Sequence, residues 1–95
     1  MFAVLGEAEI DPDRVEEAEQ VLNAVLLPQV KEMDGFVSGT WTRDRDGSRG
    51  RSIVIFRDET SAVQAADAAA SMAPPEGAPM KFKPPFDVVE VIVQT

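Results

Sequence analysis

The order in which strand-like and helix-like segments follow one another constrains this chain most. Residues 2–10 alternate between an apolar side and a mixed side, which is typical of a strand with one buried face. Residues 36–43 and 51–57 are rich in β-branched and aromatic residues, and the Gly-containing segment 44–50 between them predicts a β-hairpin. Residues 86–93 have high β-propensity and predict a fourth strand.

A long helix is predicted between the first strand and the hairpin. Asp11 is suited to cap its first free N–H groups, and Pro12 fits the first helical position, where no N–H is needed. Pro28 removes a hydrogen bond and is expected to bend the last turns, and Gly35 is expected to end the helix in a left-handed conformation. The apolar stripe with a 3.6-residue period consists of Val15, Ala18, Leu22, Val25, Leu26, Val30 and Met33.

A second, Ala-rich helix is predicted from Glu59 to about Met72, with Asp58 as its N-cap and the pair Pro74–Pro75 at its end. A loop of Pro, Gly and Lys then leads to the last strand. The order is therefore βαββαβ. Two right-handed βα units around a central hairpin predict an α+β, ferredoxin-like fold, in which a four-stranded antiparallel sheet carries both helices on one face. At 95 residues, the whole chain 1–95 is expected to form a single domain.

Charge and composition exclude several functions. The chain has 9 Lys and Arg against 17 Asp and Glu, a net charge of -8, so the phosphate backbone of a nucleic acid would be repelled. It contains no Cys, His or Tyr, which excludes thiolate and imidazole metal sites, His-ligated haem and Ser-His-Asp triads. We therefore expect no cofactor and no metal. No segment has the apolar length of a membrane span or the pattern of a secretory signal, so we expect no membrane association and a cytoplasmic protein.

The face of the sheet away from the helices is also apolar in the sequence. Leu5 alternates with Val4, Ile53 and Ile55 with Val54, and Val89 with Val88. Strands that are apolar on both faces are usually buried on both faces. A sheet-sized apolar patch exceeds what a soluble monomer normally exposes. We therefore expect a homodimer in which the sheets of two subunits pack against each other.

With this order of elements, the chain resembles the dimeric α+β barrel superfamily, which includes antibiotic-biosynthesis-monooxygenase-like proteins. The resemblance rests on residues 27–30 (LPQV), 34–37 (DGFV) and 52–59 (SIVIFRDE), besides the βαββαβ order. It implies a barrel-forming dimer and a ligand held between the sheet and the helices of one subunit. If the chain is an enzyme, the resemblance implies a cofactor-independent oxygenase or isomerase.

Three carboxylates are candidates for a general base, namely Glu7 and Glu9 on the first strand and Glu90 on the fourth. The first and fourth strands are neighbours in a sheet of this topology, and buried neighbouring carboxylates raise one another's pKa. The alternative is that these carboxylates form ion pairs with Arg51 or Arg57 on the adjacent third strand, or lie at the barrel rim.

Five residues are candidates for binding a small apolar or aromatic ligand. Trp41 offers a flat wall and one hydrogen-bond donor, although it is equally suited to a core or a dimer interface. Asn23 is either a hydrogen-bond partner for the ligand or a polar residue at the edge of the apolar stripe. The small side chains of the second helix either let it lie close to the sheet or leave space there. The full set is Asn23, Trp41, Phe56, Met72 and Phe82.

Two functions therefore stay open. The first is a monooxygenase-like protein with a small ligand between sheet and helices, and the second is a non-catalytic dimeric module that binds a ligand or another protein. An enclosed cavity of several hundred Å³ would favour the first, since this is the usual size of a ligand site. A helical layer packed flat on the sheet would favour the second.

Overall fold

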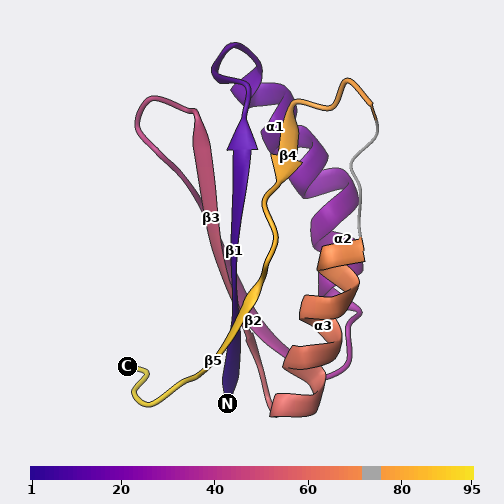
Figure 1. Cartoon of the computed structure of the whole chain (residues 1–95), viewed down its shortest axis with the longest axis vertical. Coiled ribbons are helices and arrows are strands. Elements are labelled where there is room, and N and C mark those ends of the chain that lie inside the picture. The colour runs from indigo at the N-terminus through magenta and orange to yellow at the C-terminus, as the bar shows by residue number, and fades with distance from the viewer. Residues whose placement is uncertain (72–75) are drawn as a thin grey trace.

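The central strand is β1 (Phe2–Ile10), and every other strand is placed by its pairing with β1 or with β3 (Arg49–Phe56). The computed structural model describes residues 1–71 and 76–95. On one side β1 pairs with β3, which pairs in turn with β2 (Phe36–Arg43). On the other side β1 pairs with β4 (Met80–Phe82) and β5 (Asp87–Glu90). All pairings are antiparallel, so the sheet follows the predicted order, with the fourth strand in two pieces (Figure 1).

The fourth strand differs from its prediction over residues 86–93. Only Asp87–Glu90 is assigned to β5, and β4 lies within the segment expected to be a loop. The two pieces pair with opposite ends of β1, because Phe82 lies opposite Ala8 and Val89 lies opposite Ala3. Pro84 and Pro85 lie between the two pieces and have no N–H to donate to the strand pairing, which explains why the fourth strand is interrupted there.

The first helical segment contains more than one kind of helix. It consists of the 3-10 turn η1 (Pro12–Arg14), the helix α1 (Val15–Val21), the π-helical turn η2 (Leu22–Leu26) and the helix α2 (Leu27–Lys31). As predicted, the Asp11 carboxylate accepts a hydrogen bond at its start, from the N–H of Asp13 at 3.0 Å. The helix ends at Lys31, earlier than predicted. Gly35 has the expected left-handed conformation, with a φ of 78°.

The second helix, α3 (Glu59–Ser71), lies close to the sheet because its inner side chains are small. The Asp58 carboxylate accepts a hydrogen bond of 2.8 Å from the N–H of Ser61 and so caps the helix as predicted. Ala62, Ala65 and Ala66 are buried in the core against Val4, Val54 and Phe56. The predicted end of the helix falls on Met72, Ala73, Pro74 and Pro75, which lie outside the described residues.

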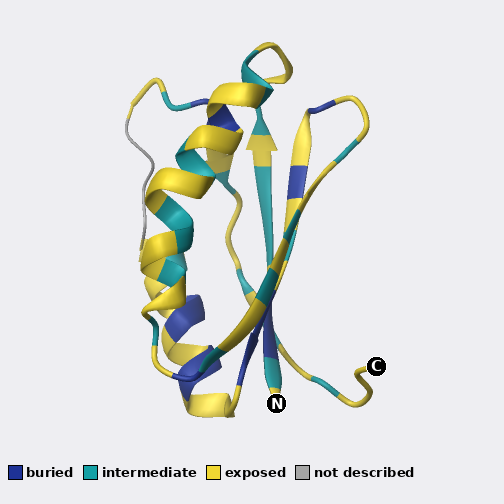
Figure 2. Cartoon of the chain, turned by 180° about the vertical axis from the view of Figure 1, so that it is seen from behind, coloured by how far each residue is buried: buried dark blue, intermediate teal, exposed yellow. Residues whose placement is uncertain are grey.

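The helices cover one face of the sheet, and the core is concentrated at one end of it. Buried residues gather in Figure 2 where the start of α3 meets β1 and β3. Toward the other end, the helical layer of α1, η2 and α2 stands further from the sheet. Among the described residues, the backbone of this layer lies near a strand at fewer places than the backbone of α3 does. The space between this layer and the sheet therefore has to be filled by side chains or by a ligand.

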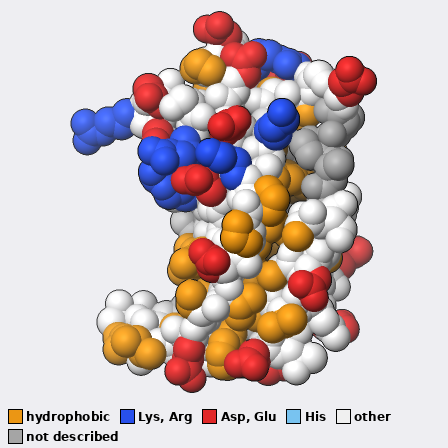
Figure 3. Space-filling view, in the orientation of Figure 1, with side chains coloured by type: hydrophobic (Ala, Val, Ile, Leu, Met, Phe, Trp, Pro, Cys, Tyr) orange, Lys and Arg blue, Asp and Glu red, His pale blue; other side chains and the backbone are white. Residues whose placement is uncertain are grey.

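The outer face of the sheet is divided into an apolar half and an ionic half. Near the N-terminal end of β1, Leu5, Ile53 and Val89 are each exposed to about two fifths, at 37%, 41% and 38%. At the other end, Glu7 and Glu9 lie opposite Arg51 and Arg49. Figure 3 shows basic side chains gathered around the β2–β3 hairpin with acidic ones among them. The outer face is thus less uniformly apolar than the sequence predicts, because strand ends near the hairpin carry ion pairs.

These elements define an α+β, ferredoxin-like fold with an antiparallel sheet and both helical layers on one face, as predicted. Among the described residues, none of the helices has the length and apolar character needed to cross a membrane.

Candidate functional site

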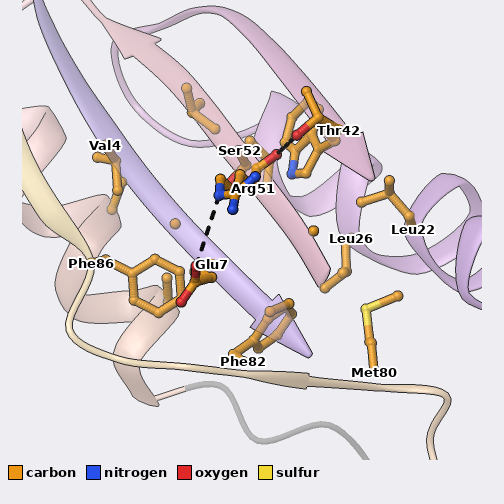
Figure 4. A pocket seen from close by; sticks show the side chains of 18 of the residues that line it. Val4, Glu7, Leu22, Leu26, Thr42, Arg51, Ser52, Met80, Phe82 and Phe86 are labelled. Carbon is orange, nitrogen blue, oxygen red and sulfur yellow. Dashed lines mark hydrogen bonds and ion pairs between the residues drawn. The ribbon is translucent and has the colours of Figure 1, made fainter. Parts of the chain in front are cut away.

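A largely apolar pocket lies between the sheet and the helical layer of α1, η2 and α2 (Figure 4). Its volume is about 140 Å³. One water molecule occupies roughly 10–15 Å³ of such a cavity, so the pocket has room for about ten water molecules. This volume is below the several hundred Å³ that would favour a monooxygenase-like ligand site, but the helical layer is not packed flat on the sheet either. The lining residues are Val4, Gly6, Glu7, Ala8, Ile10, Leu22, Leu26, Val30, Met33, Trp41, Thr42, Gly50, Arg51, Ser52, Val54, Phe56, Ala65, Ala69, Met80, Phe82 and Phe86.

Small residues on β1 and β3 form the floor of the pocket. Gly6 and Ala8 lie on the inner face of β1, opposite Ser52 and Gly50 of β3. A Cβ atom at Gly6 would lie 2.8 Å from the Ser52 hydroxyl oxygen and 2.9 Å from the Phe86 ring. Both groups therefore rest directly on the Gly6 backbone. The floor at Gly6 is therefore covered by the Ser52 hydroxyl and the Phe86 ring, which occupy the space that a side chain would take.

Aromatic rings form the side walls. The indole of Trp41 lies over Gly39 on β2, since a Cβ there would be 2.5 Å from the Trp41 ring. Phe82 and Phe86 meet edge to face on the other side, with ring centroids 6.3 Å apart. At the base, Phe56 is only 1% exposed. Flat aromatic walls of this kind favour ligands that are themselves flat and apolar.

The helical wall is built by Leu22, Leu26, Val30 and Met33. Val25, which the 3.6-residue period places on the same stripe, is 49% exposed. The π-helical turn η2 is the reason, because it holds one residue more than an α-helical turn and changes which side chains face inward. The helix continues past Pro28 to Lys31, and the irregularity expected at the proline takes the form of the π-helical turn just before it.

The three candidate carboxylates are not brought together. The Oε1 atom of Glu7 lies 3.4 Å from Nη1 of Arg49 and 3.9 Å from Nε of Arg51. Oε1 of Glu9 lies 3.4 Å from Nζ of Lys83. Glu90 lies opposite Phe2 and is therefore far along the strand from both. Glu7 therefore forms an ion pair with Arg51, which is the alternative to a buried general base that the sequence left open.

The position of Glu7 on β1 limits its access to a ligand in the pocket. It lies between the inner-face residues Gly6 and Ala8, so strand alternation directs its side chain to the outer face, toward Arg51. Arg51 also forms an ion pair with Asp44, in which Nη1 of Arg51 lies 2.8 Å from Oδ1 of Asp44. Asp44 also bonds the neighbouring Arg49 and raises the pKa of that guanidinium. Glu7 thus borders the pocket as part of an ion-pair network.

The structure places three of the five candidate binding residues in the pocket lining, namely Trp41, Phe56 and Phe82. Asn23 is exposed and outside the lining, and its Nδ2 donates to the Glu19 carbonyl at 3.0 Å. Met72 lies outside the described residues.

Sequence reasoning missed the floor residues and Phe86. The signal for the floor was the set of small residues at alternate positions on β1, which on sequence alone indicate only an apolar strand face. Lining residues not predicted to bind a ligand include Gly6, Ala8, Gly50, Ser52 and Phe86.

The site can hold a ligand by shape and apolar contact, with few polar groups to orient it. Ser52 and the Trp41 indole are polar groups of inner-face residues. Residues 1–71 and 76–95 contain no cluster of three or more acidic side chains that could hold a metal ion.

Comparison with known proteins supports the fold. No protein-family model matches the chain, and no curated protein is similar to it in sequence. Among solved structures, it is similar to the crystal structure of a monooxygenase from the gene ActVA-Orf6 of Streptomyces coelicolor, in complex with the ligand nanaomycin D. The TM-score is 0.56 at 16% identity, over 99% of this chain and 91% of that one. The chain therefore shares its fold with that monooxygenase, and at this identity the likeness shows the fold alone.

Proposed function

We propose that this protein is a monooxygenase-like homodimer that binds a small apolar or aromatic molecule in the pocket between its sheet and its helices. The observation that carries the proposal is the pocket itself, with the small residues Gly6 and Ala8 in its floor and aromatic walls at Trp41, Phe82 and Phe86. The similar monooxygenase was crystallised with the ligand nanaomycin D, which supports ligand binding as the use of this fold.

The proposed reaction relies on the ligand's own reactivity with oxygen. The chain has no His, Cys or Tyr, and we assign it no cofactor. A carboxylate would act as the base, and Glu7 is the candidate that borders the pocket, whereas Glu9 and Glu90 are outside the lining. Oxygen uptake with a bound phenol, compared between the native chain and Glu7→Gln, tests this reaction.

A non-catalytic ligand-binding dimer is the second candidate, and the placement of the carboxylates favours it. Glu7 is directed to the outer face and paired with Arg49 and Arg51, which leaves the inner face without a carboxylate base. This candidate predicts ligand binding without oxygen uptake, and an unchanged bound ligand after incubation in air.

The homodimer is proposed from the apolar half of the outer face. Leu5, Ile53 and Val89 lie beside one another on neighbouring strands and remain partly exposed. A second copy of the chain would present the same residues about a two-fold axis and cover them. The ionic half of each outer face would lie at the rim of such an interface.

Native mass spectrometry of protein purified from its own host tests binding and assembly in one experiment. The proposal predicts the mass of two chains, with an additional small molecule retained by the dimer at low activation energy. A single chain would contradict the dimer. A dimer that carries no small molecule and takes up neither phenols nor apolar rings on titration would contradict the binding function.

A further inference from the structure

The helical segment that forms one wall of the pocket contains one residue more than a regular α-helix would need to keep its inward-facing side chains in a continuous stripe. Its inward residues Ala18, Leu22, Leu26 and Val30 are each separated by four positions, and Met33 follows three positions later. Four residues of α-helix turn by about 400°, so each such step drifts by about 40° and three steps drift by about 120°. In an α-helix, Val30 would therefore point well away from the side of Ala18.

The π-helical turn η2 compensates for this drift. The N–H of Leu27 donates to the carbonyl of Leu22, five residues earlier, instead of to that of Asn23. Deleting one residue from this turn would change the inward spacing to four, three, four and three, which is the spacing of a regular α-helical stripe. The turn thus corresponds to a one-residue insertion in an otherwise α-helical wall.

Pro28 by itself is a sufficient reason for a π-helical turn here, so a role of the turn in binding has to be tested separately from the effect of the proline. In an α-helix its ring would clash with the carbonyl of Ala24, four residues earlier. The π turn lies immediately before Pro28 and includes Ala24. The exposed side of the turn carries Asn23, Ala24 and Val25, while Leu22 and Leu26 line the pocket.

We propose that η2 is the specificity-determining element of the pocket, and that the spacing of Leu22 and Leu26 sets the size of aromatic ring system that the pocket accepts. This inference rests on the proposed binding function. The pocket volume of about 140 Å³ is close to that of an apolar protein cavity, about 150 Å³, that binds benzene. The ligand class is therefore a compact phenol with one ring, whose hydroxyl meets Ser52 or the Trp41 indole, in preference to fused rings.

The first test removes the extra residue. Deletion of Ala24, combined with Pro28→Ala to avoid the proline clash, brings Leu26 closer to Leu22 by about 1.5 Å along the helix axis. Pro28→Ala alone is the matched control. Isothermal titration with para-cresol and β-naphthol gives the ratio of their dissociation constants. The deletion is expected to shift this ratio against β-naphthol by about tenfold or more relative to the control, the scale on which apolar pockets discriminate single methylenes.

The second test widens the wall without changing the helix. Leu26→Ala removes three carbons from the lining and is expected to shift the ratio toward β-naphthol by about tenfold or more. Val25→Ala, one residue away on the exposed side of the same turn, is expected to leave the ratio within about twofold. If the deletion variant fails to fold, the comparison of Leu26→Ala with Val25→Ala still tests whether this turn sets the size of ring that the pocket accepts.

The possible failures are distinguishable. If the native chain binds both phenols and Leu26→Ala leaves their ratio unchanged, the inference about η2 is overturned while the binding function stands. If Val25→Ala shifts the ratio as much as Leu26→Ala does, the effect is not specific to the pocket side and the inference is also overturned. If the native chain binds neither phenol, the proposed binding of aromatic molecules fails, and the inference fails with it.

Discussion

Filling the pocket from its floor is expected to stabilise the protein and to weaken ligand binding at the same time. Ala8 lies on the inner face of β1, opposite Gly50 and Phe82, and lines the pocket. Ala8→Leu adds three carbons to a space of about 140 Å³, which has room for them. Filling a cavity that is kept open for a ligand raises the stability of the protein and reduces its function.

The size of the effect follows from burial. Three carbons at about 0.8 kcal/mol each contribute about 2.4 kcal/mol to the free energy of unfolding. The lost rotamer freedom of Leu costs about 0.5–1 kcal/mol, which leaves a gain of about 1.5 kcal/mol. For a domain of this size, that gain corresponds to an increase in Tm of roughly 6–12 °C. The dissociation constant for para-cresol is expected to rise by at least about tenfold, because the ring and the new side chain compete for one space.

The assay is calorimetric unfolding and isothermal titration at equal protein concentration, since the Tm of a dimer depends on concentration. Ala62→Leu is the control. Ala62 is 0% exposed in the core, outside the pocket, so the same substitution should overpack it and cost about 1–3 kcal/mol. The reasoning is refuted if Ala8→Leu destabilises as much as the control does. It is also refuted if Ala8→Leu stabilises the protein and leaves para-cresol binding unchanged.

Three further predictions concern assembly and the fold. Leu5→Asp places a charge on the half-exposed apolar part of the outer face and should convert the dimer to a folded monomer in sedimentation equilibrium; a variant that stays dimeric would contradict the proposed interface. Gly35→Ala should lower the free energy of unfolding by about 1–3 kcal/mol in urea titrations, because Gly35 has a positive φ and a Cβ there would lie 2.5 Å from the Ser61 hydroxyl oxygen; an unchanged stability would refute this. The N–H of Ser61 lowers the pKa of the Asp58 carboxyl, so the stability that this charge provides is present above its ordinary pKa and is lost as the pH falls through its folded pKa. Asp58→Asn keeps an acceptor at the helix start and should lose less stability between pH 5 and pH 2 than the native chain; equal losses would contradict the assignment.

The order of elements was predictable because strand and helix periodicities are local properties of the sequence. The alternation in residues 2–10 and the caps at Asp11 and Asp58 required no knowledge of distant contacts. Two of the differences arose from proline. Pro28 occurs within a helix that continues through a π turn, and Pro84–Pro85 divide the fourth strand into two pieces.

The candidate site was predictable only at its large apolar side chains. Trp41, Phe56 and Phe82 lie in the pocket lining, although the sequence alone left a core or interface position equally open for Trp41. The floor could not be predicted, because a glycine such as Gly6 has no side chain and its role depends on the Phe86 ring resting on it. Ion pairing of Glu7 depends on the register of β1 with β3, which the sequence does not specify to the residue.

The central claim is that a small aromatic molecule occupies the space between sheet and helices. Chemical-shift mapping of the nitrogen-15-labelled protein with para-cresol tests it most directly. The account predicts saturable shifts of the Gly6 and Gly50 amides and of the Trp41 indole N–H, all at the pocket, and no comparable change at the amides of Ile92 and Val93, which are exposed and outside the lining. Shifts confined to the outer face, or no shifts when the ligand is present at its solubility limit, would contradict the claim.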